Sequence, residues 1–289
     1  MSDNHAHFVL DANAGTACRE ILKQSGGDMY FATMFLPPQA RDLANVLFAF
    51  DAQIRSIPHL VAEPMAGEVR VQWWTDVVMR ERDGEAAGHP LARALVQLLD
   101  FDPSLAPTLT AKLQAHIFDF YSDPMEDRAM LEGWCGETLS VLLHRTALAC
   151  GAEADTRLAD LSGHAGCAVA MTRLLETIAF QRSRNQCYFP MDLLSAVGLS
   201  ATEFMEPPDE RHRIALSGMV DLAAEHLNRA NEAQMISAIE PAKAAFRVLA
   251  ATRMRHKRIK KQLMKDWQRL FAGMPPPSQL RVQWALLRG

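Results

Sequence analysis

The chain has 289 residues, 49% of them hydrophobic and 22% charged, and its net charge is −4 at pH 7. This length and apolar content suit one large domain, or two small ones, with a substantial buried core. A weakly acidic chain gives no reason to expect nucleic acid as a partner.

The N-terminal region does not have the composition of a targeting segment. Residues 1–16 contain His and Asp but neither Lys nor Arg, unlike a signal or transit peptide, and we expect them to form a flexible tail. No apolar run approaches the ~20 residues that span a bilayer. Five scattered cysteines without a C-x-x-C pair favour buried thiols in a reducing compartment. We expect a cytoplasmic protein, either soluble or peripheral to the inner membrane.

Apolar residues recur at helical spacing along most of the chain, and strand-like alternation is nearly absent. The expected helices cover residues 39–57, 69–79, 90–99, 105–121, 131–150, 158–180, 219–239 and 242–271. Pro37 and Pro38 suit the first turn of a helix, and Gly151 suits a helix end. The helix at 158–180 is rich in Ala and Gly, which permits close helix packing. No break separates two cores, so we expect one all-α domain over residues 1–289.

General catalytic motifs are missing. The chain has no dinucleotide-binding glycine motif, no Walker A loop and no H-E-x-x-H pair. None of the ten histidines has a second His or a Cys four residues further along the chain. These motifs alone therefore assign no function.

Three segments, 29–50, 119–151 and 163–194, have the order and spacing of motifs in one known family. They include Tyr30, the Leu36-Pro37 turn, and Tyr188 with Pro190. Together they make the region 17–198 resemble the squalene/phytoene synthase family. The resemblance implies the all-α isoprenoid synthase fold, a single helical bundle around a central apolar cavity.

The same resemblance shows where the chain departs from active synthases. Those enzymes carry two aspartate-rich motifs on opposed helices, which hold Mg²⁺ against the substrate diphosphates. The resemblance places these aspartate positions here at residues that are not acidic: Arg55, Ser56, His59, Thr177 and Gln181. We therefore expect no catalytic residue, no metal ligand and no cofactor, although Mg²⁺ is the family's cofactor. Asp51 and Glu176 lie one turn away, without an acidic partner at i+4.

A narrower resemblance concerns residues 50–78, with Glu63-Pro64, Gly67, Arg70, Gln72, Trp73 and Trp74. This stretch is similar to the branch of the family that includes a mitochondrial complex I assembly factor and its bacterial relatives. The resemblance implies a pseudoenzyme that binds a lipid or a partner, with a role in respiratory complex I assembly. The alternative is an active prenyltransferase with an atypical site, which joins prenyl diphosphates head to head. For Trp73 and Trp74 we expect a packing role.

Several residues are candidates for binding a prenyl or phospholipid ligand: Tyr30, Arg55, Arg173, Arg182 and Tyr188. An arginine can hold a phosphate directly, because its planar fork matches two phosphate oxygens. Alternatively, these arginines and Arg184 pair with acids such as Asp51, Glu63 or Glu176.

A basic run from Arg253 to Lys265 carries seven Lys or Arg. On a helix it would form a surface either for an anionic membrane or for an assembly partner, or a merely solvated face.

Overall fold

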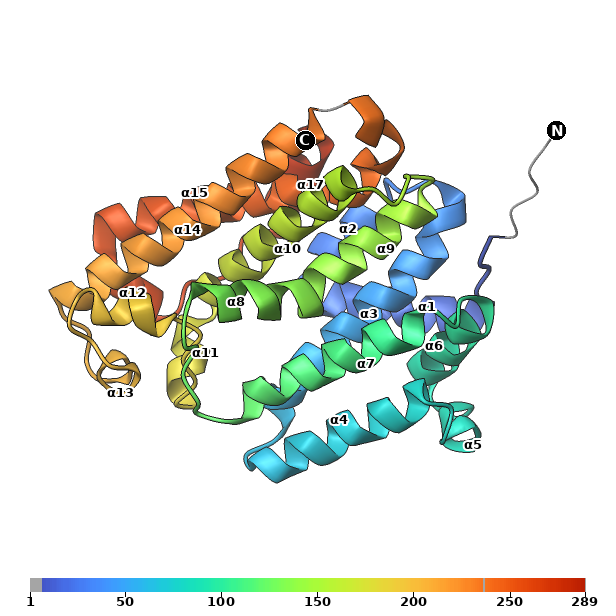
Figure 1. The fold of residues 1–289 in the computed structure, drawn as a ribbon, viewed down its shortest axis with the longest axis horizontal. Coiled ribbons are helices and arrows are strands. Elements are labelled where there is room, and N and C mark those ends of the chain that lie inside the picture. Colours follow the sequence, from blue (N-terminus) through green and yellow to red (C-terminus); the bar gives the residue numbers. More distant parts are fainter. Residues whose placement is uncertain (1–6, 236, 289) are drawn as a thin grey trace.

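The described part of the chain is built from helices (Figure 1). The structure is a computed structural model, and it describes residues 7–235 and 237–288. The elements of the core and the cavity wall are α1 (Ala12–Gln24), α2 (Asp28–Thr33), α3 (Pro38–Leu60), α4 (Pro64–Val78), α6 (Pro90–Phe101), α7 (Leu105–Ala115), η1 (His116–Phe120), α8 (Arg128–Cys135), η2 (Gly136–Ser140), α9 (Val141–Ala149), α10 (Thr156–Glu176), α11 (Ile178–Ser183), α14 (Glu210–Gln234), η3 (Ser237–Phe246), α15 (Val248–Asp266) and α17 (Gln279–Arg288). Four shorter helices are α5 (Asp83–Ala86), α12 (Met191–Ser195), α13 (Ala201–Met205) and α16 (Gln268–Ala272). The all-α prediction is confirmed. Within the described residues, no helix is both long enough and apolar enough to cross a bilayer.

Helix α10 lies at the centre of the bundle and packs against α14, α15, α9 and the π-helical turn η2. A Cβ on Gly166 of α10 would lie only 2.5 Å from the Cα of Ser140 in η2. The backbones of the two elements are therefore in direct contact. This contact confirms the close helix packing expected from the small residues of this segment.

Helix α3 forms the other wall of the core, against α1, α6 and α9. It begins at Pro38, where a missing N–H leaves no helical bond unmade. Phe50, Ile54 and Ile57 on its inner face are fully buried. Trp74 is buried against Phe50, with ring centroids 5.4 Å apart, as expected for a packing residue. Trp73 is half-buried, and its Nε1 donates to Glu85 at 3.0 Å.

Several helices that the periodicity predicted as continuous are broken in the structure, including 242–271, which is divided among η3, α15 and α16. The segment 105–121 changes from α7 into the 3₁₀ turn η1, and 131–150 contains the π turn η2. The segment 158–180 breaks at Thr177, between α10 and α11. There Thr177 Oγ1 donates to the carbonyl of Arg173 at 3.0 Å, and Gln181 Nε2 donates to that of Leu174 at 2.6 Å. The Gln181 bond satisfies the carbonyl of Leu174, which a continuous helix would have paired with the N–H of Ile178, while the carbonyl of Arg173 still accepts from the N–H of Thr177 at 3.1 Å.

The expected flexible tail is wrong for residues 7–16, while residues 1–6 lie outside the described residues. Phe8 and Leu10 are buried, and the side chain of Asp11 accepts hydrogen bonds from the backbone of Asn13 and Ala14 to cap α1. All five cysteines are buried and free, as predicted.

The basic run on α15 does not form one surface. Arg255 points inward, where Asp28 and Glu176 bind its guanidinium at 2.6 and 2.8 Å. Arg253 donates to Asn231, and Arg258 donates to the carbonyl of Pro275. The exposed members are the four lysines, Lys257, Lys260, Lys261 and Lys265.

Candidate ligand-binding site

A cavity of about 120 Å³ lies where the broken helices meet α3. Its wall includes α3, η1, the α8–η2 junction, α10, α11 and the loop that follows α11. Pro58, Leu139, Ala170, Leu174 and Phe180 supply apolar wall. Polar and charged groups supply the rest: Asp51, Arg55, His59, His116, Asp119, Trp134, Thr138, Arg173, Thr177, Gln181, Arg184, Gln186 and Tyr188.

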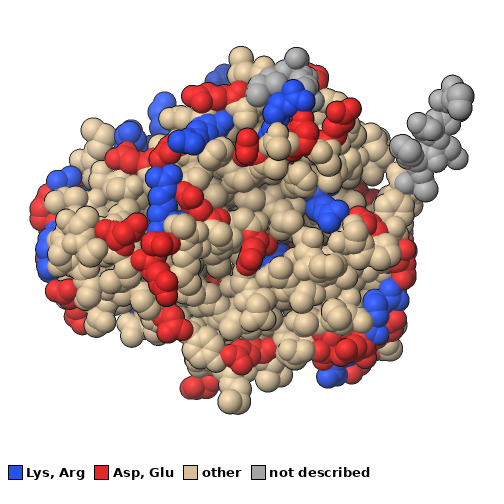
Figure 2. Space-filling view, in the orientation of Figure 1, with Lys and Arg blue, Asp and Glu red and all other residues tan. Residues whose placement is uncertain are grey.

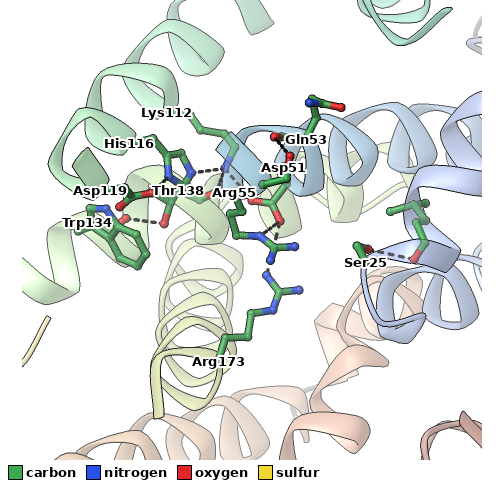
Figure 3. Close-up of polar contacts among 12 residues, drawn as sticks. Ser25, Asp51, Gln53, Arg55, Lys112, His116, Asp119, Trp134, Thr138 and Arg173 are labelled. Atoms are coloured by element: carbon green, nitrogen blue, oxygen red, sulfur yellow. Dashed lines mark hydrogen bonds and ion pairs between the residues drawn. The ribbon is translucent and has the colours of Figure 1, made fainter. Parts of the chain in front are cut away.

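Asp51 is the centre of a charged cluster at this cavity (Figure 3). Its Oδ2 accepts from Arg55 Nε at 2.9 Å and from Arg173 Nη1 at 3.5 Å. Its Oδ1 accepts from Lys112 Nζ at 2.7 Å. Lys112 is completely buried and also donates to the carbonyl of Thr138 at 2.6 Å. The carboxylate of Asp51 thus contacts three cations, one each from α3, α7 and α10.

The cluster continues as a chain of hydrogen-bonded side chains. Lys112 Nζ lies 3.1 Å from His116 Nε2, and His116 Nδ1 lies 2.6 Å from Asp119 Oδ2. The hydroxyl of Tyr188 donates to Asp119 Oδ1 at 2.5 Å. Each of these groups is buried and each has a partner, so the network holds η1 and the Tyr188 loop in fixed positions relative to α3.

Burial and neighbouring charge set the protonation of the cluster. Burial alone would raise the pKa of Asp51, but Arg55, Lys112 and Arg173 together hold that pKa well below its usual range. Burial, followed by the charge of Lys112, lowers the pKa of His116. Burial and the nearby Arg184 and Arg55 lower the pKa of His59. At neutral pH we therefore expect a charged Asp51 beside neutral imidazoles.

Two residues of the cavity wall carry buried N–H groups that find no acceptor among the described residues. They are Trp134, through Nε1, and Arg184, through Nε. The Nη1 of Arg184 donates to the carbonyl of Val61 at 2.8 Å. Buried donors without an acceptor are costly.

The structure brings most of the predicted site residues to this cavity, but not all of them. Arg55, His59, Arg173, Thr177, Gln181 and Tyr188 line it. Ser56 does not, because its hydroxyl turns back to the carbonyl of Gln53 at 2.7 Å. Tyr30 lies elsewhere on α2, in a separate hollow with Arg19 and Arg41. Arg182 points away and donates to the carbonyls of Met205 and Glu206.

Arg55 and Arg173 do not stand free of carboxylates at the cavity, because both pair with Asp51. The open alternative, pairing with nearby acids, describes them correctly. Arg184 is the arginine of the cavity wall for which the described residues provide no ion pair, and its contacts are the Val61 carbonyl and the Phe180 ring.

The carboxylates near the cavity do not fit a Mg²⁺ site, because Mg²⁺ requires several free oxygen ligands. Both oxygens of Asp51 already accept from cations, and Glu176 is held by Arg255 at 2.8 Å. In the part of the chain that the structure describes, no three His, Cys, Asp or Glu residues group as a metal site would require.

Sequence reasoning missed Lys112, His116 and Trp134. Lys112 follows Leu105 and Leu109 on the buried stripe of α7, and His116 continues the same spacing into η1. Two ionisable residues on an apolar stripe were the available signal, because such groups are buried only with partners.

The sequence and the fold of the chain are similar to those of known proteins. A model of the family described as squalene/phytoene synthase matches residues 22–286. The chain is 25% identical over 200 residues to "NADH dehydrogenase (ubiquinone) complex I, assembly factor 6" of Bos taurus, which covers 68% of this chain and 58% of that protein. The Homo sapiens protein of that name is 24% identical over 219 residues, covering 74% of this chain and 64% of that protein. The chain therefore matches less than two thirds of the length of either relative.

Solved structures agree with the family match at the level of the fold. A dehydrosqualene synthase in complex with ligand superposes with a TM-score of 0.72 at 16% identity, covering 95% of this chain and 94% of that one. The squalene synthase HpnC of Alicyclobacillus acidocaldarius gives a TM-score of 0.68 at 16% identity, covering 87% and 94%. The predicted isoprenoid synthase fold is confirmed.

Proposed function

Because the chain belongs to the squalene/phytoene synthase family, we propose that it is a non-catalytic member that binds a phosphate-bearing ligand without Mg²⁺. Its cellular role in this proposal is in the assembly of respiratory complex I. The likeness to complex I assembly factor 6 supports that role. The charge around the cavity supports the binding activity.

Positive charge exceeds negative charge at the cavity. Four cations, Arg55, Lys112, Arg173 and Arg184, face or adjoin it, against the carboxylates of Asp51 and Asp119. The surplus favours an anion, and the guanidinium of Arg184 is free of acids to bind one. The unpaired donors of Trp134 and Arg184 would gain acceptors from phosphate oxygens.

The size of the cavity limits which part of a ligand enters it. At about 120 Å³ it is smaller than the ~300–1,000 Å³ of pockets that enclose whole drug-sized molecules. We therefore assign it to the phosphate-bearing head of a prenyl diphosphate or phospholipid. The hydrocarbon chain would remain outside unless the helices move apart.

Loss of condensation chemistry is the second part of the proposal. None of the five aligned motif positions, at residues 55, 56, 59, 177 and 181, carries a carboxylate. The nearest acids, Asp51 and Glu176, are both engaged by cations. Without metal ligands the leaving diphosphate of a prenyl substrate would lack its main source of stabilisation.

Isothermal titration with pyrophosphate, farnesyl diphosphate and phosphatidylglycerol, each in EDTA, tests the binding activity. The full chain should bind at least one of the three, with an affinity that falls as salt rises. Changing Arg184→Gln should weaken binding by about 1.5–3 kcal/mol, as expected for a hydrogen bond to a charged group. The control is Arg182→Gln, on the same segment but outside the cavity, which should bind normally.

Equal binding by the two variants, or binding that requires Mg²⁺, would refute a metal-free site at Arg184. Binding of pyrophosphate but not of the lipids would assign the cavity to a free phosphate compound. The assembly role has its own test: cells without this protein should contain less assembled complex I on native gels, and an unchanged amount would contradict it.

A further inference from the structure

Helix α17 leaves an apolar face without a partner in the described structure. Val282 and Leu286 are buried against the body of the protein. On the other side of the same helix, Leu280, Trp284 and Leu287 are 77%, 56% and 60% exposed. Their spacing of four and three residues places them on one stripe. A helix that is apolar on both sides normally buries both of them.

Basic residues surround this stripe. Arg281 and Arg288 are exposed on α17, and the guanidinium of Arg288 lies 4.3 Å from the centre of the Trp284 ring. Arg247 joins the helix to the turn after α2: it donates to the carbonyls of Leu286 and Leu287 at 2.7 and 3.2 Å, and its guanidinium lies 4.5 Å from the centre of the Phe35 ring. We call these residues the α17 patch: Phe35, Arg247, Leu280, Arg281, Trp284, Leu287 and Arg288.

The patch continues into a hollow beside Arg247. Phe35, Met235, Lys243 and Arg253 line this hollow, and Met235 is 85% exposed. Acidic groups are present as well, since Glu240 pairs with Lys243 and Glu232 is exposed nearby on α14. Cations nevertheless outnumber these acids, although the chain as a whole has a net charge of −4. On the face shown in Figure 2, by contrast, acidic and basic side chains are interspersed.

We propose that the α17 patch docks the protein on the surface of an anionic lipid bilayer. A half-exposed Trp on a stripe with two Leu, bordered by Arg, is the composition of a helix that lies in a membrane interface. The apolar side chains would enter the boundary between headgroups and acyl chains, and the arginines would contact lipid phosphates. The patch shares no residue with the cavity, so this inference goes beyond the proposed function and can fail independently of it.

The charge and the shape of the patch favour a bilayer over the other possible occupants. An acidic protein would also attract the arginines, but exposed apolar side chains such as Trp284 and Leu280 suit a fluid surface that adapts to them. A second copy of the chain would place cationic patches against each other, which is repulsive. The four exposed lysines of α15 surround only Met264, so that face offers charge with little apolar area.

Co-sedimentation of the full chain with vesicles tests the proposal. The protein should bind vesicles of phosphatidylcholine with phosphatidylglycerol, and bind pure phosphatidylcholine far less. Changing Arg281→Glu with Arg288→Glu should lower the partition coefficient by about twentyfold or more, since each basic residue near such a surface contributes about fivefold. Changing Trp284→Ser with Leu287→Ser should lower it on both vesicle types.

Two matched controls make the test specific. Lys260→Glu with Lys261→Glu reverses two exposed charges on α15, and Met65→Ser with Val69→Ser removes two exposed apolar residues on α4. Both should reduce partition much less than the patch variants, with unchanged helix content by circular dichroism. Equal losses in the α15 variant, no vesicle binding at all, or a dimer in light scattering that Trp284→Ser dissolves would overturn the proposal. The last result would assign the patch to self-association.

Discussion

Replacing Lys112 with methionine tests whether the buried charge cluster stabilises the fold. Lys112 is completely buried, and its Nζ binds Asp51 Oδ1 at 2.7 Å and the carbonyl of Thr138 at 2.6 Å. Methionine fills nearly the same volume, but it cannot donate a hydrogen bond to Asp51 Oδ1 or to the carbonyl oxygen of Thr138. Removing one partner of a buried ion pair costs about 3–5 kcal/mol. Because Arg55 and Arg173 still contact Asp51, we expect a loss of about 3 kcal/mol, at the lower end of that range.

The measurement is the free energy of unfolding from urea titration, with the transition followed by circular dichroism. Lys23→Met is the matched control, since it removes the same group from an exposed pair with Glu20, where the side chains are 44% and 53% exposed. That change should cost less than about 1 kcal/mol. If Lys112→Met is no more destabilising than Lys23→Met, the cluster does not hold the cavity wall together.

Three further outcomes follow from the same geometry. Asp51→Asn should destabilise the protein most above about pH 5 and progressively less below about pH 4. The reason is that the pKa of Asp51 is depressed in the folded state, so its contribution is lost on acidification; a pH-independent difference would contradict this. Gly67→Ala should cost about 1–3 kcal/mol because its Cβ would lie 2.4 Å from the Phe120 ring, whereas Gly133→Ala, which meets nothing within 4 Å, should be neutral or stabilising; equal effects on melting temperature would refute the packing. Tyr188→Phe should cost about 1–3 kcal/mol by leaving Asp119 Oδ1 without its donor, and an unchanged urea midpoint would show that this bond contributes nothing.

The all-α fold was predictable because each helix shows itself locally, in apolar residues that repeat at helical spacing. Helical spacing located most of the longer helices, and the small residues around Gly166 indicated where two backbones meet. The breaks at η1, η2 and Thr177 were not predictable from periodicity. At Thr177, for example, the side chain of Gln181 bonds to a backbone carbonyl seven residues away, which periodicity does not record.

The site was only partly predictable, because charge pairing depends on distant parts of the chain. The sequence placed Arg55, His59, Thr177 and Gln181 at one cavity. It could not show that Asp51 binds Lys112, 61 residues further along, or Arg173, 122 residues further along. Because Arg55 and Arg173 both pair with Asp51, Arg184 is the arginine of the cavity wall that has no ion pair among the described residues. Tyr30 and Arg182 were misplaced because the family resemblance fixes their positions in sequence but not the direction of their side chains.

Product analysis with farnesyl diphosphate tests the central claim most directly. The full chain, incubated with this substrate, Mg²⁺ and a reduced nicotinamide cofactor, should give no condensed C30 product above the level of a protein-free control. An active squalene synthase in parallel should convert the substrate, which shows that the assay detects product. Turnover that rises above background and disappears with EDTA would contradict the account, and it would make this protein a prenyltransferase with an atypical metal site.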